Sequence, residues 1–282
     1  MLKQTEMKKP MNDSQQSIAK QHNRDAWNRM VAGKKRFTQP AKDGDLNQPL
    51  HTVDAIGWLG GDIAGKKVLC LAAGGGRQSA IYAATGAKVT VVDISPAMLE
   101  LDREVAAERG FDLQVVETSM DDLSMFTNQE FDIVVHPVST CYLPSIGKVF
   151  SEIARVTIPG GLYISQHKQP TSLQTGMKRS QNGYELIEPY YRTGPLPPVQ
   201  GTRLREDGTM EFLHRWEEII GGICRNGFVI EDLVEPFHAD PNMPWDSFGD
   251  RCCYTAPYVR IKARRNGTRI ETTPANKIFL PE

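Results

Sequence analysis

The chain has 282 residues, with 33 Lys and Arg against 34 Asp and Glu, so its formal net charge is −1. This near-neutral balance argues against a nucleic-acid partner, which needs a basic surplus to neutralise phosphates. No uncharged apolar stretch approaches the roughly 20 residues that span a bilayer, and the N-terminus lacks the apolar core of a signal peptide. We therefore expect no membrane partner and a cytoplasmic location.

The five cysteines favour the same compartment. Their number is odd, and no Cys-x-x-Cys pair is present to bind zinc or exchange disulfides. We expect reduced, structural thiols and no metal site, while the role of the adjacent Cys252 and Cys253 stays open.

The N-terminal part lacks the periodicity of a core domain. Residues 1–21 are polar, and we expect them to be a disordered tail. Residues 22–60 predict a helical cover, with a short amphipathic helix around Trp27 and Met30.

Strands and helices alternate from Lys67 onward. Apolar runs predict five strands, at 67–72, 88–92, 113–116, 131–136 and 162–165. Helices are predicted between them at 78–85, from the Ser95-Pro96 start to Gly110, and around 146–153. Such alternation produces βαβ units, so we expect a parallel sheet covered on both faces.

The rhythm breaks after Gln166. Residues 168–210 are rich in proline and tyrosine and predict an insertion on the substrate side, without a clear helix. A helix follows, with apolar residues at helical spacing from Trp216 to Ile223. Residues 228–233 and 254–262 predict two strands that pair antiparallel, and residues 264–282 a loose tail.

Ligands of such sheets bind beyond the carboxyl ends of the strands, near the point where the strand order reverses. The first strand ends in a glycine turn that lets a ligand approach the backbone, and the second ends in Asp93, which can accept both hydroxyls of a ribose. Met120 offers an apolar face for an adenine and Asp121 an acceptor for its amino group. These strand ends predict a nucleoside-binding site, although Asp93 could instead cap the helix at Ser95.

Four segments in this order resemble the class I S-adenosylmethionine-dependent methyltransferases. They are Val68–Gly76, Val91–Leu99, Phe131–Val135 and Ala154–Gly161, and the resemblance spans roughly residues 22–263. It implies an α/β, doubly wound, Rossmann-like fold over 61–263, with a seven-stranded, mostly parallel sheet whose last pair includes one antiparallel strand.

The resemblance also implies the activity and the cofactor site. The expected reaction moves a methyl group from S-adenosylmethionine to a small-molecule acceptor and leaves S-adenosylhomocysteine. The cofactor-binding residues are expected to be Ala72, Ala73, Gly74, Gly76, Asp93, Ile94, Met98, Met120, Asp121 and His136.

The first motif departs from the family pattern. Cys70 stands where the family usually has an acid, and Ala72 stands where it usually has the first glycine. In this the chain resembles a little-characterised bacterial subgroup with the same Leu-Cys-Leu-Ala turn. Backbone carbonyls near Ala72 are the expected substitute for holding the amino group of the methionine moiety.

An oxygen or nitrogen acceptor can require removal of a proton, for which histidine is well matched at neutral pH. The candidates are His136, His167 and His214, in descending order. As alternatives, His136 could pack beneath the sheet edge, His167 could be an ordinary surface histidine, and His214 could cap the helix that follows it. The acceptor pocket is expected to include the aromatic residues Trp27, Tyr142, Tyr190 and Tyr191.

Two alternatives stay open. A nicotinamide-dependent oxidoreductase uses the same half-fold, but its Gly-x-Gly-x-x-Gly pattern has Ser79 at the third position here. A non-catalytic S-adenosylmethionine-binding regulatory protein is also compatible with the sequence. The acceptor, the methylated atom and the oligomeric state cannot be read from these patterns.

Overall fold

The computed structural model describes residues 13–266. Its centre is a seven-stranded sheet in the order β3-β2-β1-β4-β5-β9-β8, in which β9 runs antiparallel to both of its neighbours. The strands are β1 (Lys67–Leu71), β2 (Lys88–Asp93), β3 (Leu113–Glu117), β4 (Phe131–His136), β5 (Thr157–Lys168), β8 (Phe228–Val234) and β9 (Tyr258–Arg265). The expected doubly wound, mostly parallel sheet is confirmed.

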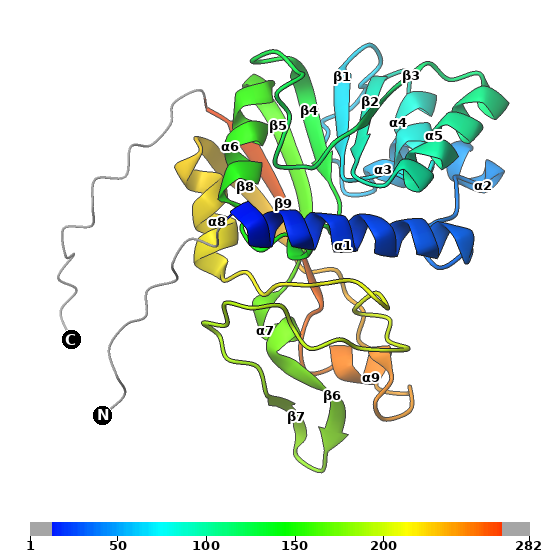
Figure 1. Ribbon diagram of the computed structural model, residues 1–282. Helices are drawn as coiled ribbons and strands as arrows, with labels where there is room; N and C mark the ends of the chain where they lie inside the picture. The colour runs from blue at the N-terminus through cyan, green and yellow to red at the C-terminus, as the bar shows by residue number, and fades with distance from the viewer. Residues whose placement is uncertain (1–12, 267–282) are drawn as a thin grey trace, which may run out of the picture.

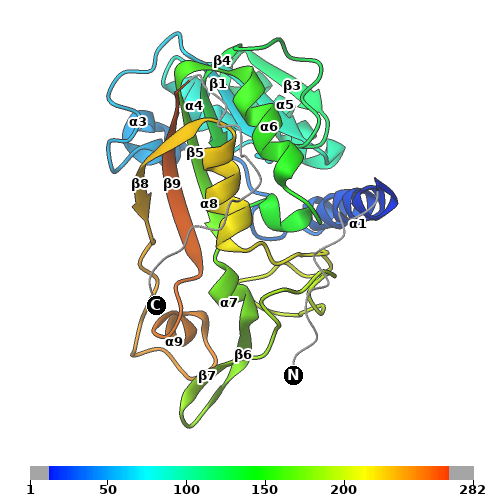
Figure 2. The same cartoon turned by 90° about the vertical axis from the view of Figure 1, so that its left-hand side faces the viewer.

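Helices cover both faces of the sheet (Figure 2). The first face carries α3 (Pro49–Val53), α4 (Gln78–Ala84) and α5 (Pro96–Arg109), and the second carries α6 (Gly147–Val156) and α8 (Trp216–Arg225). Successive residues of β1 serve opposite faces, because Val68 and Cys70 pack with the first set of helices while Leu69 and Leu71 pack with the second. This two-sided burial explains why the strand is an uninterrupted apolar run.

Helix α5 begins and ends where its sequence predicts. The Ser95 side chain accepts a hydrogen bond from the Met98 amide at 3.1 Å, and Pro96 occupies the first turn. Gly110 ends the helix with a φ of 69°, a left-handed conformation that favours glycine. These caps place the start of α5 immediately after Asp93.

The strand order reverses between β1 and β4, since β1 pairs with β2 on one side and with β4 on the other. The carboxyl ends of these strands are crossed by α1 (Asp13–Ala32), drawn in blue in Figure 1. Below α1 in that view lies a small lobe of α7 (Pro170–Gln174), β6 (Thr175–Ser180), β7 (Gly183–Leu186) and α9 (Phe248–Cys252). The short elements α2 (Asp43–Leu46) and the 3-10 turn η1 (Thr140–Tyr142) complete the chain path.

Some boundaries differ from those expected. Helix α1 begins at Asp13, so residues 13–21 are not a tail, while residues 1–12 lie outside the described part. Strand β5 begins at Thr157 rather than Leu162, because the Pro159-Gly160-Gly161 stretch forms an irregularity within the strand instead of ending an element.

The C-terminal boundaries and the insertion also differ. Strand β9 starts at Tyr258, four residues late, because α9 and a turn occupy the preceding segment. It continues to Arg265, so the first residues of the expected tail belong to the sheet, and residues 267–282 lie outside the described part. The insertion contains the short helix α7 and the hairpin β6–β7.

Within residues 13–266, no helix combines the length and apolar character needed to cross a bilayer.

Candidate functional site

The turn after β1 has a backbone conformation that residues with a side chain rarely adopt. Ala72, Gly75 and Gly76 have φ angles of 48°, 110° and 71°. A Cβ atom on Gly74 would lie 2.9 Å from Cβ of Met98 and 3.0 Å from the carboxyl carbon of Asp93. The turn is thus pressed against the end of β2 and the start of α5, and only glycine fits at Gly74.

Asp93 joins this turn to helix α5. One carboxylate oxygen accepts a hydrogen bond from the Gly74 amide at 3.0 Å, and the other accepts one from the Ser95 amide at 2.9 Å. Burial raises the pKa of Asp93. The N-cap of α5 is Ser95 and not Asp93, whose carboxylate binds the amide of that N-cap residue. Lone pairs remain on the Asp93 carboxylate for a ribose, since a carboxylate offers about four acceptor positions.

Asp121 follows β3 and faces helix α1. Its carboxylate lies 2.7 Å from the Lys20 ammonium group and accepts hydrogen bonds from Gln16 at 3.3 Å and Ser119 at 2.5 Å. Burial alone would raise the pKa of Asp121, but the hydrogen bonds from Lys20 and Ser119 lower it, so the group is ionised. Met120 beside it is buried.

Two further contacts fasten α1 over these strand ends. The Arg24 guanidinium lies 2.6 Å from the Glu117 carboxylate at the end of β3. The Asn28 side-chain oxygen accepts a hydrogen bond from the Ser95 hydroxyl at 2.7 Å. Helix α1 therefore forms a cover over the carboxyl ends of β2 and β3.

The predicted cofactor residues fall on neighbouring strand ends. Ala72, Ala73, Gly74 and Gly76 follow β1, Asp93, Ile94 and Met98 follow or end β2, Met120 and Asp121 follow β3, and His136 ends β4. A turn of small residues, rich in glycine, beside a carboxylate with free lone pairs fits an adenosine with its ribose. The residues present therefore fit the expected cofactor.

Asp102 is a member of this region that the sequence reasoning missed. It is fully buried on α5, and its carboxylate accepts hydrogen bonds from the Gly75 amide at 2.9 Å, the Gly76 amide at 3.0 Å and the Ser79 hydroxyl. A signal was available, because Asp102 lies one helical turn beyond Met98, on the buried side of the helix.

The three candidate histidines are all buried. The ring nitrogens of His136 contact the hydroxyls of Tyr163 at 2.9 Å and Ser139 at 2.7 Å. Those of His167 contact the hydroxyls of Thr140 and Ser165, each at 2.9 Å. Both nitrogens of each ring are thus engaged within the protein, which favours a structural role over proton transfer.

Burial keeps these two rings neutral. It lowers the pKa of His136 to about 3 and that of His167 well below the ordinary value. His214 lies just before α8, and its Nε2 atom donates to the backbone carbonyls of Thr140 at 3.1 Å and Leu143 at 2.9 Å. It therefore fastens the turn after β4.

The four candidate pocket aromatics separate into two pairs. Trp27 of α1 and Tyr142 of η1 meet edge to face, with ring centroids 5.8 Å apart. Tyr190 and Tyr191 pack on each other at 5.3 Å, and Tyr191 is 71% exposed with the Arg215 guanidinium over its ring. Only the first pair links α1 to a strand end of the sheet.

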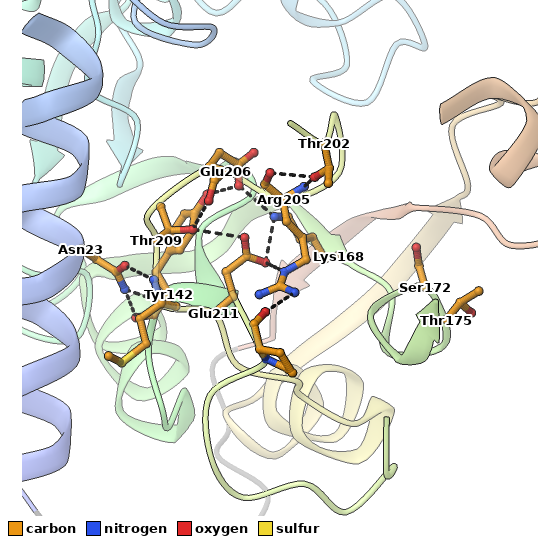
Figure 3. Close-up of polar contacts among 12 residues, drawn as sticks. Asn23, Tyr142, Lys168, Ser172, Thr175, Thr202, Arg205, Glu206, Thr209 and Glu211 are labelled. Atoms are coloured by element: carbon orange, nitrogen blue, oxygen red, sulfur yellow. Dashed lines mark hydrogen bonds and ion pairs between the residues drawn. The ribbon is translucent and has the colours of Figure 1, made fainter. Parts of the chain in front are cut away.

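A buried charge network lies beyond the ends of β4 and β5, and the sequence reasoning did not anticipate it (Figure 3). The Lys168 ammonium group lies 2.9 Å from Glu206 and 3.1 Å from Glu211, and Arg205 lies 3.2 Å from Glu211. Tyr142 donates its hydroxyl to Glu206 at 2.7 Å. Burial would lower the pKa of Lys168, but the two glutamates raise it, so this lysine is charged.

Within residues 13–266, no three His, Cys, Asp or Glu side chains gather so that they could hold a metal ion.

Comparison with known proteins gives both sequence relatives and structural neighbours. The family profile described as "Methyltransferase domain" matches residues 69–165. "Uncharacterized methyltransferase YbaJ" of Bacillus subtilis (strain 168) is 34% identical over 229 residues, which cover 76% of this chain and 89% of that protein.

Among solved structures, an S-adenosylmethionine-dependent methyltransferase from Mesorhizobium loti aligns with a TM-score of 0.61 and 19% identity, over 78% of this chain and all of that one. A geranyl diphosphate C-methyltransferase from Streptomyces coelicolor A3(2) aligns with a TM-score of 0.58 and 17% identity, over 88% and 98%. At such identities the two structures bear on the fold alone, and they agree with the doubly wound sheet.

Proposed function

Because the chain belongs to the class I S-adenosylmethionine-dependent methyltransferases, we propose that it methylates a small organic molecule bound beside the carboxyl edge of the sheet. S-adenosylmethionine is the cofactor of this family, so the alternative of a nicotinamide-dependent oxidoreductase is wrong.

The observation that carries the cofactor assignment is the convergence of three strand ends under α1. The glycine turn, Asp93 and the Met120-Asp121 pair lie on successive strands of one sheet edge. We assign the ribose to Asp93 and the adenine to Met120 and Asp121. The Lys20 and Gln16 contacts to Asp121 then belong to the cover that excludes water from this site.

When bound, the cofactor supplies an electrophilic methyl group on a positively charged sulfur. The protein aligns the acceptor with that methyl group and excludes water from the site. Alignment alone can provide effective molarities on the order of 10⁵ M or more. Because hydrogen bonds hold the rings of His136 and His167 in place, we assign these two histidines a structural role in the site. We assign the same role to His214, which is held by backbone carbonyls.

A small acceptor is supported by charge, by the aromatic pair and by analogy. The formal net charge of −1 provides no surplus of basic residues to neutralise the phosphates of a nucleic-acid acceptor. Trp27 and Tyr142 provide apolar surface between α1 and the end of β4. The Streptomyces enzyme with the same fold is described as a geranyl diphosphate methyltransferase, a small-molecule enzyme. A cytoplasmic site of action remains part of this proposal.

Ligand binding tests the cofactor assignment directly. We expect mass spectrometry of small molecules released from the purified protein to detect a sulfur-containing nucleoside, and isothermal titration to show micromolar S-adenosylhomocysteine binding. NADH should not bind. A panel of hydroxyl, amine, thiol and carbon acceptors should yield a methylated product, whereas binding without turnover on any acceptor would favour the regulatory alternative.

A substitution at Asp93 tests the ribose contact. Asp93→Asn keeps an acceptor for a backbone amide but loses the charge, so we expect S-adenosylhomocysteine binding to weaken by about 1–3 kcal/mol. Asp132→Asn makes the same change at the opposite edge of the sheet, where the Asp132 carboxylate accepts from the Lys67 amide. An unchanged dissociation constant for Asp93→Asn would count against the assignment.

A further inference from the structure

A fully buried carboxylate lies directly beneath the glycine turn. Asp102 accepts hydrogen bonds from the Gly75 amide at 2.9 Å, the Gly76 amide at 3.0 Å and the Ser79 hydroxyl, which are all neutral donors. A buried carboxylate is costly to maintain unless its hydrogen bonds are kept, so its presence here calls for a role that an apolar side chain could not fill.

The geometry shows what this carboxylate holds. Gly75 and Gly76 have φ angles of 110° and 71°, which point two successive amides of the turn at helix α5. Gly75 also donates to the Met98 carbonyl at 3.1 Å, and a Cβ atom on Gly76 would lie 2.6 Å from the Leu101 carbonyl oxygen. The turn is therefore fastened along a single face of α5.

We propose that Asp102 is a positioning residue for the cofactor, which holds the Gly75 and Gly76 amides so that the turn keeps the shape that receives S-adenosylmethionine. The turn is thereby supported by a buried carboxylate on α5, while β1, the strand before the turn, carries the neutral Cys70. This inference rests on the proposed function, in which the glycine turn contacts the cofactor.

The surroundings of Asp102 make this support sensitive to pH. Burial raises its pKa to about 7 against the lowering effect of Ser79 and the two amides, and the charge of Asp93 on β2 raises it further. Cys70 on β1 stays neutral because burial raises the pKa of its thiol.

Charged groups on the elements packed against α5 include Arg24 of α1, which pairs with Glu117 of β3, and Arg77 before α4, which pairs with Asp45 of α2. On α5 itself, Glu100 pairs with Arg103, Arg109 pairs with Asp43, and Glu104 is exposed. Near neutral pH, Asp102 therefore takes up a proton, the turn amides lose their charged acceptor, and cofactor affinity falls on acidification.

The test is titration of the full-length protein with S-adenosylhomocysteine between pH 6 and pH 8. We expect the wild-type dissociation constant to rise by about tenfold as the pH falls across this range, which is the loss expected for one charge-assisted hydrogen bond. Asp102→Asn, which cannot ionise, should bind about tenfold more weakly than wild type at pH 8 and show no such pH dependence. Glu100→Gln removes the same charge from the exposed face of α5 and should keep the wild-type profile.

A second variant keeps the proposal testable even if Asp102→Asn fails to fold. The Ser79 hydroxyl lowers the pKa of Asp102, so Ser79→Ala should move the midpoint of the wild-type binding profile to higher pH. A purely structural serine would not shift this midpoint.

A flat wild-type profile, an unmoved midpoint in Ser79→Ala, or wild-type affinity in Asp102→Asn would each overturn the proposal. If Asp93→Asn still weakened binding in such a case, the cofactor assignment would survive. If the wild-type protein bound no S-adenosylhomocysteine at any pH, the proposed function itself would fail.

Discussion

Ala72 occupies a position that suits glycine. Its φ of 48° lies in the left-handed region, where an L side chain costs roughly 1–2 kcal/mol. We expect Ala72→Gly to raise the free energy of unfolding by about 0.5 kcal/mol, because relief of strain exceeds the added entropy of the unfolded chain. Chemical denaturation measures this change.

Ala73 provides the matched control for that prediction. It is buried next to Ala72 and does not have a positive φ. Ala73→Gly should therefore lower the free energy of unfolding by about 1 kcal/mol. If both variants lost stability equally, the strain assigned to Ala72 would not exist.

The buried histidines predict how stability responds to acid. The pKa of His167 is lowered in the folded state, so between that value and the ordinary 6.5 the unfolded chain binds more protons than the folded one. The free energy of unfolding therefore decreases by about 1.4 kcal/mol for each unit by which the pH is lowered in this range. His167→Gln removes this proton. It should be less stable than wild type at pH 7, and the deficit should shrink at that rate below about pH 6.5.

A difference measurement is needed here because Asp102 acts in the opposite direction. Its folded pKa is raised to about 7, so its contribution to stability falls as the pH rises from about 4 to 7. Comparing urea unfolding of His167→Gln and wild type at each pH cancels this contribution. His51→Gln, at an exposed histidine, should leave the pH dependence unchanged, and a constant deficit in His167→Gln would contradict the prediction.

A buried amide, that of Asn23, fastens helix α1 beside its buried apolar residues Ala19, Ala26 and Met30. The Asn23 side chain donates to the carbonyls of Tyr142 at 2.8 Å and Met210 at 2.9 Å, and it accepts from the Met210 amide at 2.8 Å. Removing it leaves buried backbone groups without partners. We expect Asn23→Ala to cost about 2–3 kcal/mol and to speed amide hydrogen exchange in α1.

The control lies on the exposed side of the same helix. Gln21 donates only within α1, to Asp25 at 3.0 Å. Gln21→Ala should leave both the unfolding free energy and the exchange of α1 close to wild type. Equal behaviour of the two variants would show that Asn23 does not fasten the cover.

The same helix shows where sequence reasoning succeeds and where it fails. Strands such as β4 were predicted to the residue, because a buried parallel strand is a dense apolar run with clear ends. The first turns of α1 were missed because its buried positions are Ala19, Asn23, Ala26 and Met30. Their spacing is helical, but small and polar side chains give almost no hydrophobic periodicity.

The site was predictable to a similar extent. The glycine turn and Asp93 are local features of strand ends, so they could be located from spacing alone. The partners of Asp121 and Asp102 could not, because Lys20 and Gly75 are far from them in sequence and meet them only in the folded chain. Likewise, the hydroxyl groups that hydrogen-bond His136 and His167 could not be predicted, because the fold brings the ends of β4 and β5 together.

At the scale of the molecule, the charge network joins parts that are distant in sequence. Lys168 ends β5, while Glu206 and Glu211 belong to the long connection before α8 (Figure 3). The adjacent Met210 is held by Asn23 of α1. The sheet, the cover helix and this connection therefore meet at one cluster, at the edge where we place the acceptor.

A double-mutant cycle tests whether this cluster acts as a unit. Lys168→Met leaves the buried Glu211 and the partly buried Glu206 with Arg205 alone and should cost about 3–5 kcal/mol, because an uncompensated charge remains at the buried Glu211. Glu211→Gln leaves the opposite excess and should cost a similar amount. Combining the two restores charge balance, so we expect the double variant to be more stable than the sum of the single effects by about 1–3 kcal/mol.

Equilibrium urea unfolding of the four proteins measures this coupling. The same cycle on the exposed pair Glu100 and Arg103, whose groups lie 2.9 Å apart, provides the control and should give no more than about 0.5 kcal/mol, because solvent screens exposed pairs. Additive effects at Lys168 and Glu211 would mean that the connection is held by its other contacts. A large coupling energy would show that the end of β5 and the segment that carries Glu211 fold against each other as one structure.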